Sequence, residues 1–401
     1  MAVKVPDRII NSVLDNDKYN FGMGDFLYHK YKGHKVKFAY KCRTPGIDFT
    51  PIMDDLTNQF NLMGDLRMSM DEAHYLNTQC GISAEYVDVL LNAKLFDPSI
   101  LNYGVHGNKA LYLDYEGVNH LDIYREVTSM AVVSQLLFTH KYSTDEYAEA
   151  LASGEAFMRG QIEWLIEHAH PKFNFTEFGT RRRFSAFHQE KMLLLFKELI
   201  PQYITGTSNV HLAMKHGLKA EGTMAHLLLM FMQSIYSLAT SQIRGLEEWA
   251  EFKDPSSSLF LTDTLGDKKW DRDFSKKFME MYLGQRHDSG NPFSWGRERL
   301  SAYSDAGIDT STKKFMFSDS LDFVTANELT NAFSDDINVG NGIGTFCSNS
   351  MNYKEHKAVS QVIKMMWANG QPLVKLSADE AKAQCECMGT LAYAKTVALH
   401  Y

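Results

Sequence analysis

Polar residues that could bind an anionic substrate follow short apolar segments in the second half of the chain. Arg181 and Arg286 carry guanidinium groups, which can each bind a carboxylate or a phosphate through two parallel hydrogen bonds. Asp263, Asp288 and Asp319 lie in three further segments, and acids beside a polyphosphate hold Mg²⁺ or accept hydrogen bonds from ribose hydroxyls. Each acid taken singly is compatible with a helix N-cap, which is the favoured interpretation for Asp319. Taken together, the segments indicate a binding site.

A glycine-rich turn and a histidine add the chemistry of phosphate groups. Backbone N–H groups of the turn at Gly342, Gly344 and Thr345 suit a phosphate, although such turns are common and this signal is weak alone. His226 stands at the start of a helix predicted over residues 223–251. A helix N-terminus disfavours the imidazolium ion and suits a neutral ring that can carry a phosphate. Taken alone, His226 is better interpreted as a packed side chain.

Alternating short strands and helices must position these residues. Strands are expected at 173–178, 203–205, 259–261, 282–285, 314–317 and 337–339. Helices are expected at 185–199, 210–216, 223–251, 271–281, 292–306 and 325–333. This alternation indicates parallel strands with helical crossovers, and it favours an α/β barrel over an open sheet. Because ligand sites form at the carboxyl ends of parallel strands, the polar segments should meet at one mouth.

The two ends of the chain have a different pattern. Residues 35–43 and 110–115 alternate polar and apolar side chains, which is typical of half-buried strands, and the Asp/Asn cluster at 15–17 can cap a helix through 19–31. Asn369-Gly370 is a hairpin signal, so the tail is expected to pair with the N-terminal strands. We therefore predict a smaller α+β domain from residues 1–140 with 346–401, and an α/β barrel over 141–345.

Composition and net charge argue against several classes of protein. The 401 residues carry a net charge of −8, which argues against nucleic acid as a partner despite three consecutive arginines at 181–183. The five cysteines are scattered and odd in number, as expected for reduced thiols. The most apolar run, 224–236, is too short to span a bilayer. We expect a cytoplasmic enzyme with no membrane contact.

Several motifs in one order resemble the nicotinate phosphoribosyltransferases, a family of type II phosphoribosyltransferases. The resemblance rests on Leu14-Asp15-Asn16-Asp17-Lys18-Tyr19, Phe178-Gly179-Thr180-Arg181-Arg182-Arg183, Gly206-Thr207-Ser208-Asn209, Gly222-Thr223-Met224-Ala225-His226, Arg286-His287-Asp288-Ser289-Gly290, Gly342-Ile343-Gly344-Thr345 and Val374-Lys375-Leu376-Ser377. It implies an irregular α/β barrel with a smaller domain. It also implies that nicotinate and phosphoribosyl pyrophosphate give nicotinate mononucleotide and pyrophosphate. ATP as co-substrate, Mg²⁺ and a homodimer with sites at the interface are implied as well.

The same resemblance implies roles for the reacting groups. His226 matches the family's phosphorylated histidine, and Asp263 would orient it. Arg286 would lie near the pyridine and the pyrophosphate, while Asp288 would contact the ribose hydroxyls or Mg²⁺. Asp319 is assigned to substrate binding. The phosphohistidine would couple ATP hydrolysis to the transfer step.

Further roles concern the substrate. Phe178 and Tyr19 would sandwich the pyridine ring, with Tyr19 supplied by a neighbouring subunit, and Arg181 would meet the carboxylate. The turn formed by Gly342, Gly344 and Thr345 would hold the 5′-phosphate.

Alternatives remain open on particular residues. Related nicotinamide enzymes carry an acid where this chain has Ser208, and a neutral side chain there favours nicotinate, because an acid would repel a carboxylate. Asn291 stands where an aspartate is frequent and matches the nicotinamide branch, so a nicotinamide phosphoribosyltransferase is the alternative. A non-catalytic nucleotide sensor is a second alternative, although it would not need His226. A metal hydrolase is disfavoured, since only His287 stands at a strand end as a ligand.

Overall fold

Six parallel strands form the larger of two sheets in the computed structural model, which describes residues 3–222, 224–377 and 383–400. The strands are β4 (Phe175–Glu177), β5 (Ile204–Thr207), β6 (Leu259–Leu261), β7 (Gly284–His287), β8 (Lys314–Phe317) and β9 (Asn338–Ile343). Their order is β5-β4-β9-β8-β7-β6, and every neighbouring pair is parallel. Within the described ranges β5 and β6 are not paired with each other. All six predicted strands are confirmed, β6 and β8 with the predicted ends and the other four with shifted ends.

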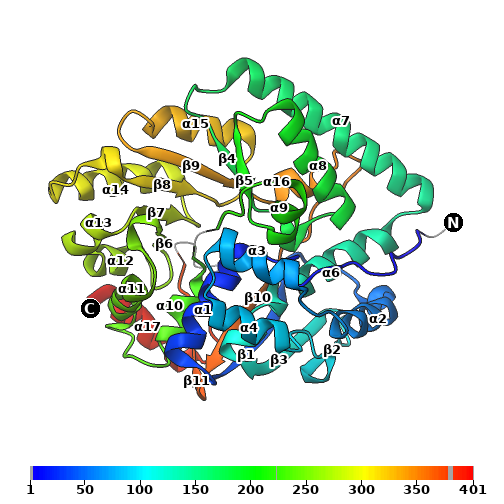
Figure 1. The fold of residues 1–401 in the computed structure, drawn as a ribbon, viewed down its shortest axis with the longest axis horizontal. Helices are drawn as coiled ribbons and strands as arrows, with labels where there is room; N and C mark the ends of the chain where they lie inside the picture. Colours follow the sequence, from blue (N-terminus) through cyan, green and yellow to red (C-terminus); the bar gives the residue numbers. More distant parts are fainter. Residues whose placement is uncertain (1–2, 223, 378–382, 401) are drawn as a thin grey trace.

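Helices connect these strands and cover the sheet (Figure 1). They are α8 (Ala186–Leu199), α9 (Val210–His216), α10 (His226–Met232), α11 (Ser241–Phe252), α12 (Asp267–Asp273), α13 (Lys276–Met281), α14 (Pro292–Asp305), α15 (Phe323–Phe333) and α16 (Thr345–Asn349). Each strand therefore reaches its parallel neighbour through a helical crossover, as the alternating pattern predicts.

Two of the predicted helices are each interrupted. The single helix predicted over 223–251 is wrong, because α10 ends at Met232 and α11 begins at Ser241. Gln233 is the C-cap of α10, and its side-chain amide exchanges two hydrogen bonds with the backbone of Val374. Ser237 then forms turn hydrogen bonds that compete with helix continuation. The helix predicted over 271–281 is likewise divided, between α12 and α13.

Strands from the two ends of the chain form the second, antiparallel sheet. They are β1 (Lys35–Cys42), β2 (Leu101–Val105), β3 (Leu111–Val118), β10 (Gln361–Ala368) and β11 (Gln371–Pro372), in the order β11-β10-β1-β3-β2. Pairing of β10 with β1 confirms that the tail returns to the N-terminal strands, and Figure 1 shows the two side by side. Asn369 and Gly370, with φ of 53° and 76°, form the predicted tight turn. The division into two domains stays a prediction.

The remaining helices lie in the first half of the chain and at its end. They are α1 (Lys18–Tyr31), α2 (Met53–Gly64), α3 (Met70–Cys80), α4 (Ala84–Asn92), α5 (Asn119–Asp122), α6 (Arg125–Lys141) and α7 (Thr144–His168), with α17 (Met388–His400) at the end of the chain. Short 3₁₀ turns are η1 (Thr50–Ile52), η2 (Pro98–Ile100), η3 (Thr180–Arg182), η4 (Pro255–Ser257) and η5 (Thr310–Thr312). The predicted side-chain cap of α1 is wrong, because Asp17 makes no capping bond there. Its carboxylate accepts a hydrogen bond from Ser208 instead.

One apolar cluster runs through both sheets and holds them together. It includes Phe38 and Tyr115 from the antiparallel sheet and Phe175, Phe260 and Phe315 from the parallel sheet. Helix α6 is buried over almost its whole length, and it packs against both β10 and η3. The facing edges of the two sheets are thereby fixed relative to each other. No helix among the described residues is long and apolar enough to cross a membrane.

Candidate active site

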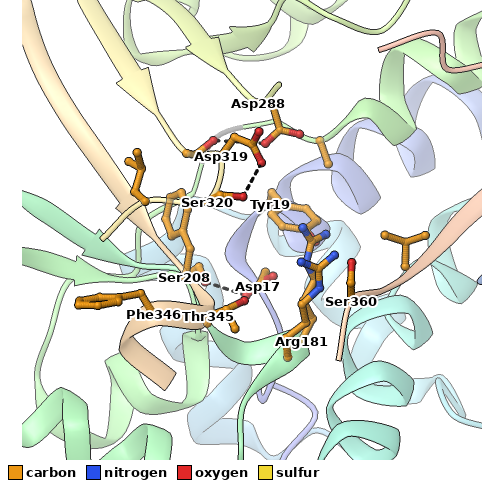
Figure 2. Close-up of a pocket in the computed structure, with 18 of the residues that line it drawn as sticks. Asp17, Tyr19, Arg181, Ser208, Asp288, Asp319, Ser320, Thr345, Phe346 and Ser360 are labelled. Carbon is orange, nitrogen blue, oxygen red and sulfur yellow. Dashed lines mark hydrogen bonds between the residues drawn. The ribbon is translucent and has the colours of Figure 1, made fainter. Parts of the chain in front are cut away.

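A cavity of about 620 Å³ lies at the carboxyl ends of the parallel strands, against strand β10 of the second sheet. Its wall is formed by Asp17, Tyr19, Arg43, Glu126, Phe178, Gly179, Arg181, Arg182, Ser208, Gly222, Ala225, His226, Arg286, Asp288, Ser318, Asp319, Ser320, Leu321, Asp322, Gly344, Thr345, Phe346, Ser350, Ser360, Val362, Lys364 and Lys375. Figure 2 shows several of these side chains pointing toward one another. The expected convergence of the strand-end segments is confirmed.

His226 is the first residue of helix α10, and its ring is held by two acids. Nε2 lies 2.7 Å from Asp263 Oδ1 and 3.8 Å from Asp288 Oδ2. Burial lowers the pKa of His226 to about 4, with a further contribution from the charge of Lys375. The ring is therefore neutral at pH 7. Since Asp263 is an acceptor, this hydrogen bond assigns the ring proton to Nε2 and leaves the lone pair on Nδ1. Thr223, in the preceding turn, lies outside the described residues.

Asp263 stands behind His226 and does not line the cavity. Its Oδ2 accepts hydrogen bonds from Ser289 Oγ at 2.6 Å and Ser377 Oγ at 3.3 Å, and Lys375 Nζ lies 3.1 Å away. Burial raises the pKa of Asp263, but its hydrogen-bonded partner His226 and the charge of Lys375 outweigh it and hold the pKa well below its usual range. Asp263 is thus a fixed anion with both oxygens engaged, suited to orienting the histidine.

Arg286 belongs to strand β7, and its side chain lies at the cavity wall. Its Nη2 donates to the carbonyl of Met224 at 2.8 Å, and its Nη1 donates to Ser318 Oγ at 3.1 Å and lies 3.4 Å from Asp288 Oδ1. Burial raises the pKa of Asp288, but the charge of Arg286 outweighs it and lowers the pKa below the usual value. Both groups are ionised and lie at the cavity wall. They form a cation–anion pair that a phosphorylated substrate can contact.

Of the aromatic rings that line the cavity, two were predicted from the sequence, and both belong to the same chain. Phe178 follows β4, and its backbone N–H donates to Ile343 at 2.8 Å. Tyr19 comes from α1. The expectation that Tyr19 comes from a neighbouring subunit is therefore not needed to complete this wall. Gly342 does not line the cavity. A Cβ there would lie 2.5 Å from the Phe178 ring, so its small size makes room for that ring rather than for a phosphate.

Arg181 stands at the end of the cavity nearest the antiparallel sheet. Its Nη1 lies 3.8 Å from Glu126 Oε1, and Lys364 Nζ lies at the same distance from that oxygen. Burial lowers the pKa of Lys364 to about 8. Ser208, from the segment after β5, donates its hydroxyl to Asp17 at 2.7 Å. This end is rich in charge and can bind a substrate carboxylate.

Gly344 and Thr345 line the cavity where helix α16 begins, as the turn motif predicts. Asp319 lies on the same wall, and its Oδ1 accepts a hydrogen bond from Ser320 at 3.2 Å (Figure 2). The favoured capping interpretation of Asp319 is wrong. Helix α15 is capped by Asp322, whose Oδ1 accepts from the backbone of Thr325 at 2.7 Å. Asp319 is left facing the cavity.

Several wall residues were not identified as site residues from the sequence. They are Asp17, Arg43, Glu126, Arg182, Lys364 and Lys375. Lys364 is a charged residue within the mostly buried strand β10. Because lysines are rarely buried, a lysine in an apolar strand indicates a functional position and could have been found from the sequence. Glu126 sits in a helix that is buried on every side, which composition alone does not show. Lys375 lay inside a motif that carried the resemblance but was given no role.

A divalent cation has one candidate set of ligands among the described residues. His226, Asp263 and Asp288 each offer an atom, and these atoms lie within 4.8 Å of one another. Asp263 is a poor ligand because Lys375 Nζ is 3.1 Å from one oxygen and His226 occupies the other. The side chain of Asp288 is 25% exposed, the most accessible of the three. A hard cation such as Mg²⁺ would therefore bind Asp288 together with oxygens of a phosphorylated substrate.

The fold and the cavity together define a class of protein. A mouth at the ends of parallel strands holds two aromatic rings, a carboxylate-binding arginine and an arginine–aspartate pair beside a neutral histidine. Those groups fit an enzyme that transfers a phosphorylated sugar to a flat, aromatic acid.

Comparison with known proteins agrees with this class. The nicotinate phosphoribosyltransferase family model matches residues 173–399, and the model of its N-terminal domain matches residues 14–134. A nicotinate phosphoribosyltransferase of Burkholderia mallei is 33% identical over 395 residues, covering 97% of this chain and 96% of the relative. One from Bordetella petrii is 32% identical, covering 97% and 98%. The chain belongs to the nicotinate phosphoribosyltransferase family.

Solved structures extend this likeness to the fold. The crystal structure of nicotinate phosphoribosyltransferase from Vibrio cholerae superposes with a TM-score of 0.92 at 31% identity, covering 97% of this chain and 94% of that chain. The enzyme from Porphyromonas gingivalis gives a TM-score of 0.89 at 26% identity, with coverage of 97% and 100%. The predicted fold class, an α/β protein of the type II phosphoribosyltransferase kind with a smaller α+β part, is confirmed.

Proposed function

We propose that this chain transfers the phosphoribosyl group of phosphoribosyl pyrophosphate to nicotinate, giving nicotinate mononucleotide and pyrophosphate for the synthesis of NAD. Membership of the family supports the reaction. The observation that carries it in the structure is one cavity with Phe178 and Tyr19 for a pyridine ring, Arg181 for its carboxylate and Arg286 for phosphate oxygens. A sensor that only binds nucleotides would not need the His226–Asp263 pair.

The geometry suggests how the residues act. Nicotinate lies between the two rings with its carboxylate at Arg181, so its ring nitrogen is held facing C1 of the ribose. The C1–pyrophosphate bond breaks as the nitrogen–C1 bond forms, and negative charge builds up on the departing pyrophosphate. Arg286 and Lys375 stabilise that charge, because both are cations at the cavity wall. Asp288 and Asp319 hold ribose hydroxyls, and the turn at Gly344 and Thr345 holds the 5′-phosphate.

ATP is proposed to act through His226. The neutral ring carries its lone pair on Nδ1, which attacks the γ-phosphorus of ATP, and ADP leaves with the electron pair of the broken bond. Asp263 holds Nε2–H throughout and stabilises the positive charge that the ring acquires. Hydrolysis of the phosphohistidine then returns phosphate and the free ring. Mg²⁺ would bind at Asp288 with the phosphate oxygens and supply charge neutralisation there.

Oligomeric state and location are also proposals. A homodimer stays a prediction, and the presence of Tyr19 in its own chain's cavity means that a second subunit is not required for the second ring. A cytoplasmic location agrees with the five cysteines being free. The absence of a nucleic-acid partner stays a prediction, and it rests on the net charge of −8.

A turnover experiment tests the transfer reaction. Purified protein with nicotinate, phosphoribosyl pyrophosphate and Mg²⁺ should form nicotinate mononucleotide and pyrophosphate in equal amounts, measured by chromatography and mass. Absence of the nucleotide with ATP present would exclude the proposed reaction.

A labelling experiment tests the phosphohistidine separately. Incubation with ATP labelled in the γ-phosphate should give an acid-labile label on the protein, absent from the His226→Ala variant. Equal labelling of both proteins would remove His226 from this role while leaving the transfer reaction untouched.

A second candidate, transfer to nicotinamide, is favoured by one observation. The carboxylate of Asp17 accepts a hydrogen bond from the hydroxyl of Ser208 at 2.7 Å. An acid therefore lies beside Ser208, where the sequence of that segment predicted only a neutral side chain. An ionised acid accepts a hydrogen bond from an amide N–H and repels a carboxylate. Choice between the two substrates therefore depends on Asp17.

A further inference from the structure

Asp17 is fixed at the end of the cavity where the substrate's carboxylate is placed. Its side chain is only 4% exposed, and its Oδ1 accepts the hydroxyl of Ser208 at 2.7 Å. The backbone holds the pair together, since Lys18 N–H donates to Ser208 at 2.8 Å and Asp17 forms an antiparallel bridge with Asn209. Figure 2 shows the hydrogen bond between Asp17 and Ser208 on the same side of the cavity as Arg181.

The charges at this end balance without a substrate. Arg181 is a cation, as is Lys364 below its pKa of about 8, and Glu126 lies 3.8 Å from both. Asp17 is the second acid, and its negative charge is one of those that raise the pKa of Arg181. Two cations therefore face two acids when Asp17 is ionised. A nicotinate carboxylate would bring a third negative charge into a buried site, which is costly unless one charge is neutralised.

Ser208 does not resolve this imbalance. Its single O–H already donates to Asp17, so it offers the substrate only lone pairs. A lone pair facing a carboxylate is repulsive. The group that can change is Asp17, because binding one proton turns it from a second acceptor into a hydrogen-bond donor.

We propose that Asp17 determines whether the cavity takes an acid or an amide, by binding one proton when nicotinate enters. This inference rests on the proposed transfer reaction. Ionised nicotinate and one proton from solvent join the enzyme, the proton forms an O–H bond on Asp17, and that O–H donates to the substrate carboxylate beside Arg181. Nicotinamide needs no proton, because the ionised Asp17 accepts from its amide N–H.

The surroundings of Asp17 favour this behaviour. Burial raises its pKa, which outweighs the hydrogen bond from Ser208 and the charge of Arg181. Glu126 raises it further. Tyr19 and Glu177 also face Asp17. Burial raises the pKa of Glu177 to about 7, so below neutral pH Glu177 is mostly protonated and adds little negative charge beside Asp17. Proton uptake by Asp17 is thereby easier than for an exposed aspartate.

Calorimetry on the wild-type protein tests proton uptake directly. Nicotinate and nicotinamide are each titrated at pH 6 to 8.5 in two buffers with different ionisation enthalpies, and the difference in heat gives the protons bound. Nicotinate binding should take up a fraction of a proton that rises toward one as pH rises, while nicotinamide binding takes up none. No uptake for nicotinate, or equal uptake for both ligands, would overturn the proposal.

Variants test the residue. Asp17→Asn keeps the shape but removes the charge, and it should raise the nicotinate-to-nicotinamide ratio of kcat/KM about tenfold at pH 8. It should also abolish the rise of the nicotinate KM with pH. Ser208→Ala removes the hydrogen bond that favours the ionised form, so it should shift that rise to higher pH. Asp54→Asn, an exposed acid in the first turn of α2, makes the same change in net charge and should alter neither quantity.

The outcomes separate this inference from the proposed function. Wild-type protein that uses neither pyridine would contradict the transfer reaction itself. Wild-type protein that uses nicotinate, with an unchanged substrate ratio and pH profile in Asp17→Asn, would contradict only the role of Asp17. If Asp17→Asn does not fold, calorimetry on Ser208→Ala decides, because that variant should move proton uptake at Asp17 to higher pH and leave any uptake at Lys364, whose pKa is about 8, in place.

Discussion

At the scale of single residues, the site depends on how each charge is compensated. Asp263 is held ionised by Lys375 and by the His226 ring, and it therefore orients the histidine instead of binding the substrate. Arg286 and Asp288 form a second pair that faces the cavity. Among the described residues, Arg181 has the more distant Glu126 as its ion-pair partner, at 3.8 Å. Its guanidinium is therefore the group at that end with most capacity for a substrate carboxylate.

Arg181→Lys should show that the shape of this cation matters as well as its charge. A lysine keeps the charge but cannot form two parallel hydrogen bonds with a carboxylate. Loss of that geometry should lower kcat/KM for nicotinate by about tenfold to a hundredfold, mainly through KM, and affect nicotinamide less. Steady-state kinetics with both substrates measure this. Arg159→Lys, on the exposed face of α7, is the matched control, and a nicotinate KM unchanged in both variants would contradict the assignment.

At the scale of elements, the cavity depends on the close approach of β4 and β9. These strands pair in parallel with Thr176 opposite Gly342, and the Phe178 ring packs over the glycine. The presence of these strands, and of the polar segments that follow them, could be predicted because short apolar runs alternate with polar segments in the sequence. The packing of Phe178 on Gly342 could not, because it depends on the order β4-β9, which brings residues far apart in sequence together. The glycine motif was for that reason assigned wholly to phosphate binding.

Gly342→Ala should displace the aromatic wall. The added Cβ would lie 2.5 Å from two ring atoms of Phe178, so the ring must move. Overpacking of this kind typically costs about 1–3 kcal/mol of stability, and the nicotinate KM should rise because the ring no longer stacks on the substrate. Thermal unfolding and kinetics measure the two effects.

Gly160→Ala is the control for that substitution. Gly160 is exposed within helix α7, and a Cβ there meets nothing within 4 Å. It should stabilise the protein by up to about 1 kcal/mol and leave KM unchanged. Equal KM values in both glycine variants would mean that Phe178 does not contact the substrate.

At the scale of the whole molecule, the site lies between two sheets that share one apolar cluster. Much of the parallel sheet was predictable because each strand is a local pattern of apolar residues. Glu126, Lys364 and Lys375 were not, because they reach the cavity through α6, β10 and the tail, whose positions depend on pairing between the two ends of the chain. The break between α10 and α11 was missed for a similar reason, since Gln233 bonds to Val374 in that distant tail.

Buried histidines should make the folded state sensitive to mild acid. Burial lowers the pKa of four histidines to about 4, namely His120, His188, His226 and His356. Unfolded histidines titrate near pH 6.5, so between pH 6.5 and 4 the unfolded chain binds protons that the folded chain does not. Stability is therefore present above pH 6.5 and is lost as pH falls toward 4.

Buried acids oppose this trend, namely Glu177 and also Asp17, Asp114, Asp267, Asp271 and Asp273, whose pKa values burial raises. Burial raises the pKa of Glu177 to about 7, so the folded state binds a proton there that an unfolded glutamate releases above pH 4.5. The four histidines lose their neutral form across this range and outnumber Glu177, whose pKa is raised to about 7, so Tm from calorimetry should fall from pH 7 to pH 5. His188→Gln should make the dependence shallower. A Tm that is constant or rises on acidification would contradict the buried, neutral state of these rings.

The most direct test of the central claim is a competition between the two pyridines. Equal concentrations of nicotinate and nicotinamide are supplied with limiting phosphoribosyl pyrophosphate, Mg²⁺ and ATP at pH 7, and the two mononucleotides are separated by mass. The charge arrangement around Arg181 and Asp17 predicts nicotinate mononucleotide as the main product, with pyrophosphate released in equal amount. Nicotinamide mononucleotide as the main product, or no nucleotide at all, would contradict it.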